Sequence, residues 1–448
     1  MSGTAQSSFS IPDDDAFIAS ALEEASIPTL MMSMIHMSGD ASLLDGTIRP
    51  AGVFINEYQG YMSEEDKATV RARALEMIKD FRDGGCKLPS SPSPATIHRM
   101  MNFIVAGDVP EDYVPMMLEE MELDGIDQRS DAWSDEVPAK ARAQHKVLVI
   151  GGGMSGVLAA YRLQEAGIPF VVIEKNFAVG GTWFENRYPG ARVDVGNHLY
   201  SYSFEPAHHW TQYFSQQKEL QQYFEGVVYH HQLEQHFRFN TEVTGAVFDE
   251  VSKEWTVNTI DKDGVEEQYV ANSVISAVGQ LNRPVLPDIP GVDSFVGQWC
   301  HSAAWDDSID CRGKKVVVVG SGASAFQLVP TIAGDVGQLT VFQRSAPWMF
   351  ENPIYHEEVP QGKKWCLQNL PFYTRWFRFL IFWPACDGAY DTVFVDPEWP
   401  HQERSINEMN DFVYQMFFDH IKGQVGDDEE LLKKVTPDYA PMGKRTLQ

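Results

Sequence analysis

The sequence predicts an α/β protein in which two βαβ units follow an α-helical N-terminal region. The first unit begins with the strand pattern KVLVI, residues 146–150, and continues through a glycine turn and a helical stretch to the strand PFVVIEK, residues 169–175. The second unit reads KKVVVVGSGASAFQLVPTIA followed by QLTVFQR, residues 314–344. Because strand, glycine turn, helix and strand recur in the same order, two domains of similar architecture are the simplest explanation.

Residues 1–140 form a separate helical, acidic and methionine-rich region. Its clearest helix begins at Ser63, which can cap the helix with Asp66 as capping-box partner, and ends at Gly84 and Gly85. One face of this helix is apolar and must be buried, through Val70, Ala74, Met77, Ile78 and Phe81. Adaptable methionines indicate either a helical core or a subunit interface; they are Met31, Met32, Met34, Met37, Met100, Met101, Met116 and Met117.

The first glycine turn has the pattern GxGxxG through Gly151, Gly153 and Gly156, between a strand and a helix. Glycines let the backbone approach a pyrophosphate, whose charge is met by the N-terminus of the helix. Glu174 ends the next strand, where a carboxylate can accept hydrogen bonds from a ribose diol. A lone GxGxxG is often only a tight turn, but strand, helix and acid together predict a dinucleotide site in residues 141–294.

The second glycine turn carries Gly320 and Gly322, with the permitted alanine Ala325 at its third position. The strand that follows ends in Gln343 and Arg344 instead of an acid. An acid would repel a 2′-phosphate, whereas Arg344 can pair with it through charge-assisted hydrogen bonds; alternatively, Arg344 is an ordinary surface charge. The two turns therefore indicate FAD in the first domain and NADPH in the second, residues 314–436, with hydride passing from nicotinamide to flavin.

The bulk composition excludes several other classes of protein. The 448 residues carry a formal net charge of −28, which repels nucleic acid. Five cysteines without a CxxC pair favour reduced thiols in a cytoplasmic setting and predict no metal site. The N-terminus lacks a secretory pattern, and the longest apolar run, residues 379–384, is far shorter than the roughly 20 residues of a membrane span. That run is more simply a buried aromatic helix than a pocket wall or a membrane contact.

Two longer motifs carry a family resemblance. GGTWFENRYPGARVD, residues 180–194, and FVGQWCHSAAWD, residues 295–306, resemble the two signatures of type I Baeyer–Villiger monooxygenases. The second motif fills every fixed position of FxGxxxHxxxW followed by Pro or Asp, through Phe295, Gly297, His301, Trp305 and Asp306. The related flavin-containing and N-hydroxylating monooxygenases usually place Phe or Tyr where Trp305 stands, so they are the alternative.

The resemblance implies a set of site residues, carried over position by position. FAD would be held by Gly151, Gly153, Gly156, Glu174, Thr182, Trp183, Asp194 and Tyr200. NADPH would be held by Gly320, Gly322, Ser324, Ala325, Gln343, Arg344 and Lys444. Asp194 corresponds to the family's active-site aspartate, and Arg445, in PDYAPMGKRTLQ, to its essential active-site arginine.

The resemblance also implies a reaction. One oxygen atom of O2 would be inserted beside a ketone carbonyl, through a C4a-peroxyflavin, to give an ester or lactone. Arg445 would stabilise the peroxide and the developing oxyanion as a fixed cation, and Asp194 would orient it. Two alternatives are open: oxygenation of sulfur or nitrogen by the same flavin, and a catalytically incomplete fragment that acts as an interaction partner.

The family comparison finally suggests how the parts are joined. Residues 295–313 would be a linker with the monooxygenase fingerprint, in which His301 and Trp305 serve domain packing and movement instead of proton transfer. Residues 437–448 would begin the return to the FAD domain, and since family members continue well beyond them, we expect a C-terminally shortened chain that binds FAD weakly. N-terminal extensions of this kind are associated with dimer formation, so a homodimer is implied.

Overall fold

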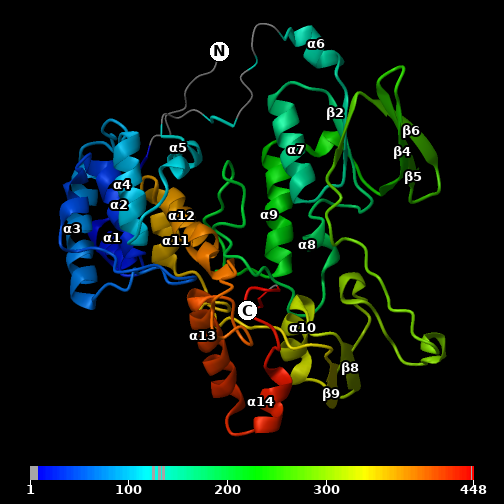
Figure 1. Cartoon of the computed structure of the whole chain (residues 1–448). Coiled ribbons are helices and arrows are strands. Elements are labelled where there is room, and N and C mark those ends of the chain that lie inside the picture. Colours follow the sequence, from blue (N-terminus) through cyan, green and yellow to red (C-terminus); the bar gives the residue numbers. More distant parts are fainter. Residues whose placement is uncertain (1–8, 124–126, 130–132, 134–136, 445, 448) are drawn as a thin grey trace.

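The computed structural model describes residues 9–123, 127–129, 133, 137–444 and 446–447. The N-terminal helices gather on one side of the molecule, and the sheets lie on the other (Figure 1). Short 3₁₀ helices occur at Ala41–Asp45, Glu111–Tyr113, Glu234–His236, Val292–Ser294, Ser302–Ala304 and Asp387–Val393. Among the described residues, no helix combines the length and the apolar character that crossing a membrane requires.

The N-terminal region is helical, as the sequence predicts. Its helices are α1 (Asp15–Leu22), α2 (Ile27–Ser38), α3 (Glu64–Asp83), α4 (Pro94–Val105) and α5 (Val114–Met121). The start of α3 is confirmed, because the Ser63 hydroxyl accepts a hydrogen bond from the Asp66 N–H. The Asp66 carboxylate in turn accepts from the Ser63 hydroxyl at 2.9 Å, not from the Ser63 backbone N–H of a standard capping box.

The methionines of this region belong to a helical core. Met32, Met100 and Met101 are fully buried, and Met116 is partly buried against the same cluster. The core alternative is therefore confirmed for these side chains.

Two later helices, α11 (Gln361–Asn369) and α12 (Tyr373–Ala385), complete the N-terminal core. Trp376, Phe379 and Trp383 of α12 are buried in it together with residues of α2 and α4. The indole N–H of Trp376 donates to Nε2 of His36 at 2.9 Å. The prediction of a buried aromatic helix is thus confirmed, and its neighbours come from a part of the chain more than 250 residues earlier in the sequence.

The first βαβ unit lies in a parallel sheet of order β3-β2-β1-β7. Its strands are β1 (Val147–Ile150), β2 (Phe170–Ile173), β3 (Phe237–Arg238) and β7 (Ser273–Ser276). Helices α6 (Ala139–Gln144), α7 (Met154–Glu165), α8 (Thr182–Glu185) and α9 (Gln217–His230) belong to the same part of the chain. α7 packs on β1, β2 and α9, so the start of α7 lies at the carboxyl edge of the sheet (Figure 1).

An antiparallel sheet is inserted between β3 and β7. Its strands are β4 (Thr241–Asp249), β5 (Glu254–Asp261) and β6 (Glu266–Ala271). Val257 of β5 is buried against Leu148 of β1 and Ile173 of β2. The antiparallel sheet therefore covers one face of the parallel sheet.

The second βαβ unit consists of β8 (Lys315–Val319), α10 (Ala323–Ala333) and β9 (Gln338–Phe342). The strands are parallel and, among the described residues, pair only with each other. Val317, Val319 and Phe342 are exposed. Helices α13 (Glu408–Val425) and α14 (Glu429–Val435) follow, and α13 buries Phe417 against Trp348. The domain boundaries proposed from the sequence remain predictions.

Candidate functional site

The first glycine turn is a close backbone junction. Gly151 has φ +102°, a conformation that side chains other than glycine rarely adopt. A Cβ on Gly156 would overlap the Gly151 carbonyl oxygen, and Gly153 lies against Gly181. The turn therefore requires small residues at these positions for packing alone, and it leaves the N-terminus of α7 open to an anion.

Glu174 sits beneath this turn and is only 4% exposed. Its two carboxylate oxygens accept hydrogen bonds from the backbone N–H groups of Gly152, at 2.6 Å, and Asn176, at 2.8 Å. Burial raises the pKa of Glu174, although the two N–H groups act in the opposite direction. Glu174 is thus fixed at the end of β2, and its contact with a ribose remains a prediction.

A cavity of about 290 Å³ opens beside the first turn, at the lower end of the range for ligand pockets. Trp183 and Tyr200 form part of its wall, with ring planes at 88° and the indole N–H donating to the tyrosine hydroxyl at 3.1 Å. Of the residues assigned to FAD, the wall contains Gly151, Gly153, Glu174, Thr182, Trp183 and Tyr200. Gly156 and Asp194 lie outside the wall.

The sequence did not identify several other residues of this wall, among them Lys175, Asn176, Asn282 and Arg283. Arg283 is held by Glu242 at 3.0 Å. A usable signal existed, because residues 277–283 directly follow β7, and carboxyl ends of parallel strands meet at one edge of a sheet.

Asp194 lies on the segment that precedes Tyr200 in the chain. Its charge contributes to the raised pKa of the Tyr200 phenol, although burial is the larger cause. The neighbouring Arg192 is buried and donates to the Tyr355 carbonyl oxygen at 2.8 Å and to Nδ1 of His356 at 2.7 Å. Asp194 is therefore held near the first cavity by an anchored backbone.

A second cavity, of about 650 Å³, lies at the second glycine turn. Its wall contains Gly320, Gly322, Gln343, Arg344 and Lys444. Two of these side chains have contacts of their own: Gln343 donates to the carbonyl oxygen of Lys434 at 3.0 Å, and Nζ of Lys444 lies 4.2 Å from the ring centre of Tyr439. Lys444 thus lines the same cavity as Arg344, although it lies 100 residues later in the sequence.

The remaining residues assigned to the second site are placed differently. Ser324 and Ala325 lie in the first turn of α10 and outside the cavity wall. Arg445 lies outside the described residues.

The two cavities differ in charge. The second has two cations, Arg344 and Lys444, and no carboxylate among the described residues of its wall. The first has three carboxylates, Glu174, Glu185 and Glu242, and two cations, Lys175 and Arg283, which pair with Glu185 and Glu242. This difference matches what the two strand ends, acid and arginine, predict.

Gln327 of α10 links the second βαβ unit to Tyr188 and Arg192 of the segment that follows the first glycine turn. Its side-chain oxygen accepts from the Tyr188 hydroxyl at 2.8 Å, and its amide donates to the Arg192 carbonyl oxygen at 2.9 Å. Trp305 of the fingerprint segment packs on Leu328 and Tyr188 in the same small cluster, and Nδ1 of His301 accepts from the Ala303 N–H at 3.0 Å. These contacts give both fingerprint residues a packing or capping role, whereas Phe295 of the same segment is exposed.

Known proteins match most of the chain. A family model described as pyridine nucleotide-disulphide oxidoreductase matches residues 148–362. The uncharacterised monooxygenase y4iD of Sinorhizobium fredii is 35% identical over 431 residues, which is 96% of this chain and 64% of that relative. A Baeyer-Villiger monooxygenase of Streptomyces coelicolor is 38% identical over 303 residues, 67% of this chain and 55% of that relative. The chain thus spans less than two thirds of the length of these relatives.

The fold is also similar to that of a solved structure. The crystal structure of OTEMO in complex with FAD and NADP has a TM-score of 0.57 and 27% sequence identity, covering 68% of this chain and 63% of that one. The α/β architecture with two Rossmann-like units is therefore confirmed. By sequence the chain is similar to a Baeyer-Villiger monooxygenase, and by fold it is similar to a structure in complex with FAD and NADP.

Proposed function

We propose that the chain acts as an FAD- and NADPH-dependent monooxygenase of the Baeyer–Villiger type, with a ketone and O2 as substrates. The observation that carries the proposal is the pair of glycine turns, each beside a cavity, with Glu174 in the wall of the first cavity and Arg344 in the wall of the second. A Baeyer-Villiger monooxygenase among the relatives, and a similar structure in complex with FAD and NADP, support the same reading.

The first cavity fits FAD. Gly151, Gly153 and the first residues of α7 line this cavity, so a pyrophosphate bound there would meet the N-terminus of the helix. Each carboxylate oxygen of Glu174 uses one lone pair for a backbone N–H and keeps another for a ribose hydroxyl. Trp183 and Tyr200 would flank the flavin half.

The second cavity fits NADPH. Gly320 has φ +115° and precedes the N-terminus of α10, which attracts the pyrophosphate. Arg344 and Lys444 would pair with the 2′-phosphate, which NADH lacks. Among the residues assigned to NADPH, these two carry the preference for the phosphorylated cofactor.

In the reaction, bound FAD supplies the electron pair that activates O2 for transfer to the ketone. We assign the fixed cation at the reacting centre to Arg445, because a guanidinium stays charged at working pH and stabilises a developing oxyanion. Asp194 orients that cation and moderates its charge. Lys444, which precedes Arg445 in the sequence, lines the second cavity.

The substrate and the assembly are further parts of the proposal. The chain resembles 4-hydroxyacetophenone monooxygenase in its N-terminal stretch IPTLMMSMIHMSGD, which suggests an aryl ketone and a cytoplasmic homodimer. The aromatic side chains Trp376, Phe379 and Trp383 do not support the choice of substrate, because they are buried in the N-terminal core.

The test uses the whole chain loaded with FAD and supplied with NADPH, O2 and an aryl methyl ketone. We expect NADPH oxidation and an ester product that contains one atom from labelled O2, with NADH a poorer reductant. A thioether in place of the ketone tests the alternative reaction. Formation of sulfoxide without any ester would reject the ketone proposal, and a protein that self-associates but never oxidises NADPH would be an interaction partner instead.

A further inference from the structure

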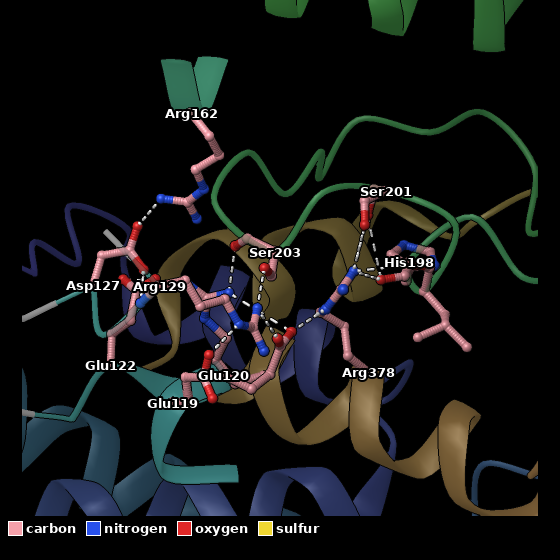
Figure 2. A network of polar contacts seen from close by, with 12 residues as sticks. Glu119, Glu120, Glu122, Asp127, Arg129, Arg162, His198, Ser201, Ser203 and Arg378 are labelled. Atoms are coloured by element: carbon pink, nitrogen blue, oxygen red, sulfur yellow. Dashed lines mark hydrogen bonds and ion pairs between the residues drawn. The ribbon is translucent and has the colours of Figure 1, made fainter. Parts of the chain in front are cut away.

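The loop of residues 198–203 connects the first cavity with the N-terminal region. It carries Tyr200, a residue of the cavity wall. Side chains from α12, from the end of α5 and from Arg129 converge on this loop (Figure 2). Because the loop has no regular secondary structure, its carbonyl groups need partners from elsewhere in the chain.

Arg378 of α12 supplies several of these partners. Its Nη1 donates to the carbonyl oxygen of His198 at 2.7 Å and to the hydroxyl of Ser201 at 3.0 Å. Longer contacts reach the carbonyl oxygens of Leu199 at 3.4 Å and Ser201 at 3.3 Å. The Arg378 side chain is 8% exposed, so bulk water cannot replace these bonds.

Glu120, at the end of α5, holds Arg378 in place. Its Oε1 accepts from Nε of Arg378 at 2.7 Å, and its Oε2 accepts from Arg129 at 3.1 Å. Arg129 also donates to the Ser203 hydroxyl at 2.6 Å, and Arg375 donates to the Ser203 carbonyl oxygen. Glu120 therefore pairs with all three arginines that bind the loop, although its ion pair with Arg375 is longer, at 3.9 Å.

The loop of residues 198–203 contacts a rigid helix, α12, on one side and the first cavity on the other. α12 is packed in the N-terminal core, so Arg378 projects from a fixed helix. On the other side, the Tyr200 hydroxyl accepts from Trp183, and the Tyr202 hydroxyl donates to the carbonyl oxygen of Met154, the first residue of α7. A shift of the loop would move both a cavity wall and the start of the helix behind the first glycine turn.

We propose that Arg378 is a positioning residue for the flavin site and that Glu120 positions Arg378. Together they make the N-terminal helical region an intramolecular brace of the first cavity, whether or not that region also forms a dimer. The inference rests on the proposed function only where it names FAD as the ligand. The ordering of the loop by Arg378 is a property of the chain without any cofactor.

Hydrogen exchange of the cofactor-free chain tests the ordering. Arg378→Met keeps the apolar stem and removes every donor, so amides of residues 198–203 should exchange about tenfold faster or more. Arg378→Lys should restore only part of the protection, since a point charge cannot reach Glu120 and the loop carbonyls at once. Arg99→Met is the matched control, because Arg99 forms a half-exposed ion pair with Asp45 in the same region. Wild-type exchange in a folded Arg378→Met chain would overturn the brace.

Glu120→Gln provides a milder variant if Arg378→Met does not fold. It removes the counter-charge and leaves the loop contacts of Arg378 in place. We expect an acceleration of about threefold over Arg99→Met in the same amides. If these amides exchanged at the same rate as in Arg99→Met, Glu120 would not position Arg378.

FAD affinity tests the link to the cavity. Arg378→Met should raise the Kd for FAD about tenfold, and the effect should be smaller in a Tyr200→Ala background because both changes act through one loop. Independent, multiplicative effects would show that Arg378 does not act through Tyr200. If the wild-type chain binds no FAD while Arg378→Met still loosens the loop, the proposed function fails and the brace stands.

Discussion

The two βαβ units begin with nearly the same residues, KVLVIGGGMSG and KVVVVGSGASA, yet their surroundings differ. In the first unit Leu148 is fully buried between two sheets, whereas Val317, at the equivalent place in the second, is 57% exposed. At the third position of the turn, Gly156 has no room for a Cβ, whereas the second turn carries Ala325 there. The local pattern thus specifies the strand, turn and helix, and neighbouring elements decide how much change each position tolerates.

The largest expected effect is a difference in stability between alanine variants of the two glycine turns. Gly156→Ala should destabilise the chain by more than about 3 kcal/mol and abolish FAD binding, because the new methyl group meets the backbone of Gly151. Gly322→Ala, at the second glycine position of the other turn, is the control and should lower stability by less than about 1 kcal/mol, since the new methyl group meets open space. Urea unfolding with flavin titration measures both. Equal losses of stability in the two variants would contradict a steric difference between the turns.

The two central strands offer the next comparison. Leu148→Ala should cost about 2–5 kcal/mol, because it opens a cavity between the parallel and antiparallel sheets. Val317→Ala should change stability by no more than about 0.5 kcal/mol, since the side chain is exposed. The unfolding midpoints of the two variants measure these changes in stability. A large loss of stability in Val317→Ala would mean that the exposed face of β8 is covered in solution.

The charge difference between the cavities predicts cofactor choice. Arg344→Ala should raise the KM for NADPH about 10- to 100-fold, because it removes charge-assisted hydrogen bonds to the 2′-phosphate. The KM for NADH should stay within about twofold, since NADH has no such group. Arg312→Ala is the control, because Arg312 is exposed and bonded to Asp310. A parallel loss with both cofactors would contradict a specific phosphate contact.

The smallest effect concerns pH. Burial raises the pKa of Glu174 in the folded chain, so this group favours the folded state most at a pH below its unfolded value of about 4.5. That contribution is lost as the pH rises through the raised folded value. The stability of the wild type relative to Glu174→Gln should therefore fall as pH increases above about 4.5. Gln343→Leu, at the matching strand end, should show no such trend, and a rising difference would reverse the sign of the pKa shift.

Much of this molecule was predictable from local patterns. The capping of α3 by Ser63, both βαβ units and the acid and arginine at their strand ends follow from spacings of a few residues. Gly151, Gly153 and Glu174 line the first cavity for the same reason, whereas Thr182, Trp183 and Tyr200 of the same wall were implied by the family resemblance. Lys175 and Arg283 were missed although they follow the ends of β2 and β7, whereas the place of Glu242 in the same wall depends on how β2, β4 and β7 meet.

The sequence by itself determined the order of elements, the two glycine turns and the opposite charges at the ends of β2 and β9. Each depends on residues close together in the chain, where backbone geometry and periodicity leave few alternatives. The tertiary structure alone decided that α12 completes the N-terminal core, that Lys444 lines the same cavity as Arg344, and that Arg378 holds the loop of Tyr200. These contacts join residues about 100 or more positions apart, and only packing of the whole chain selects such partners.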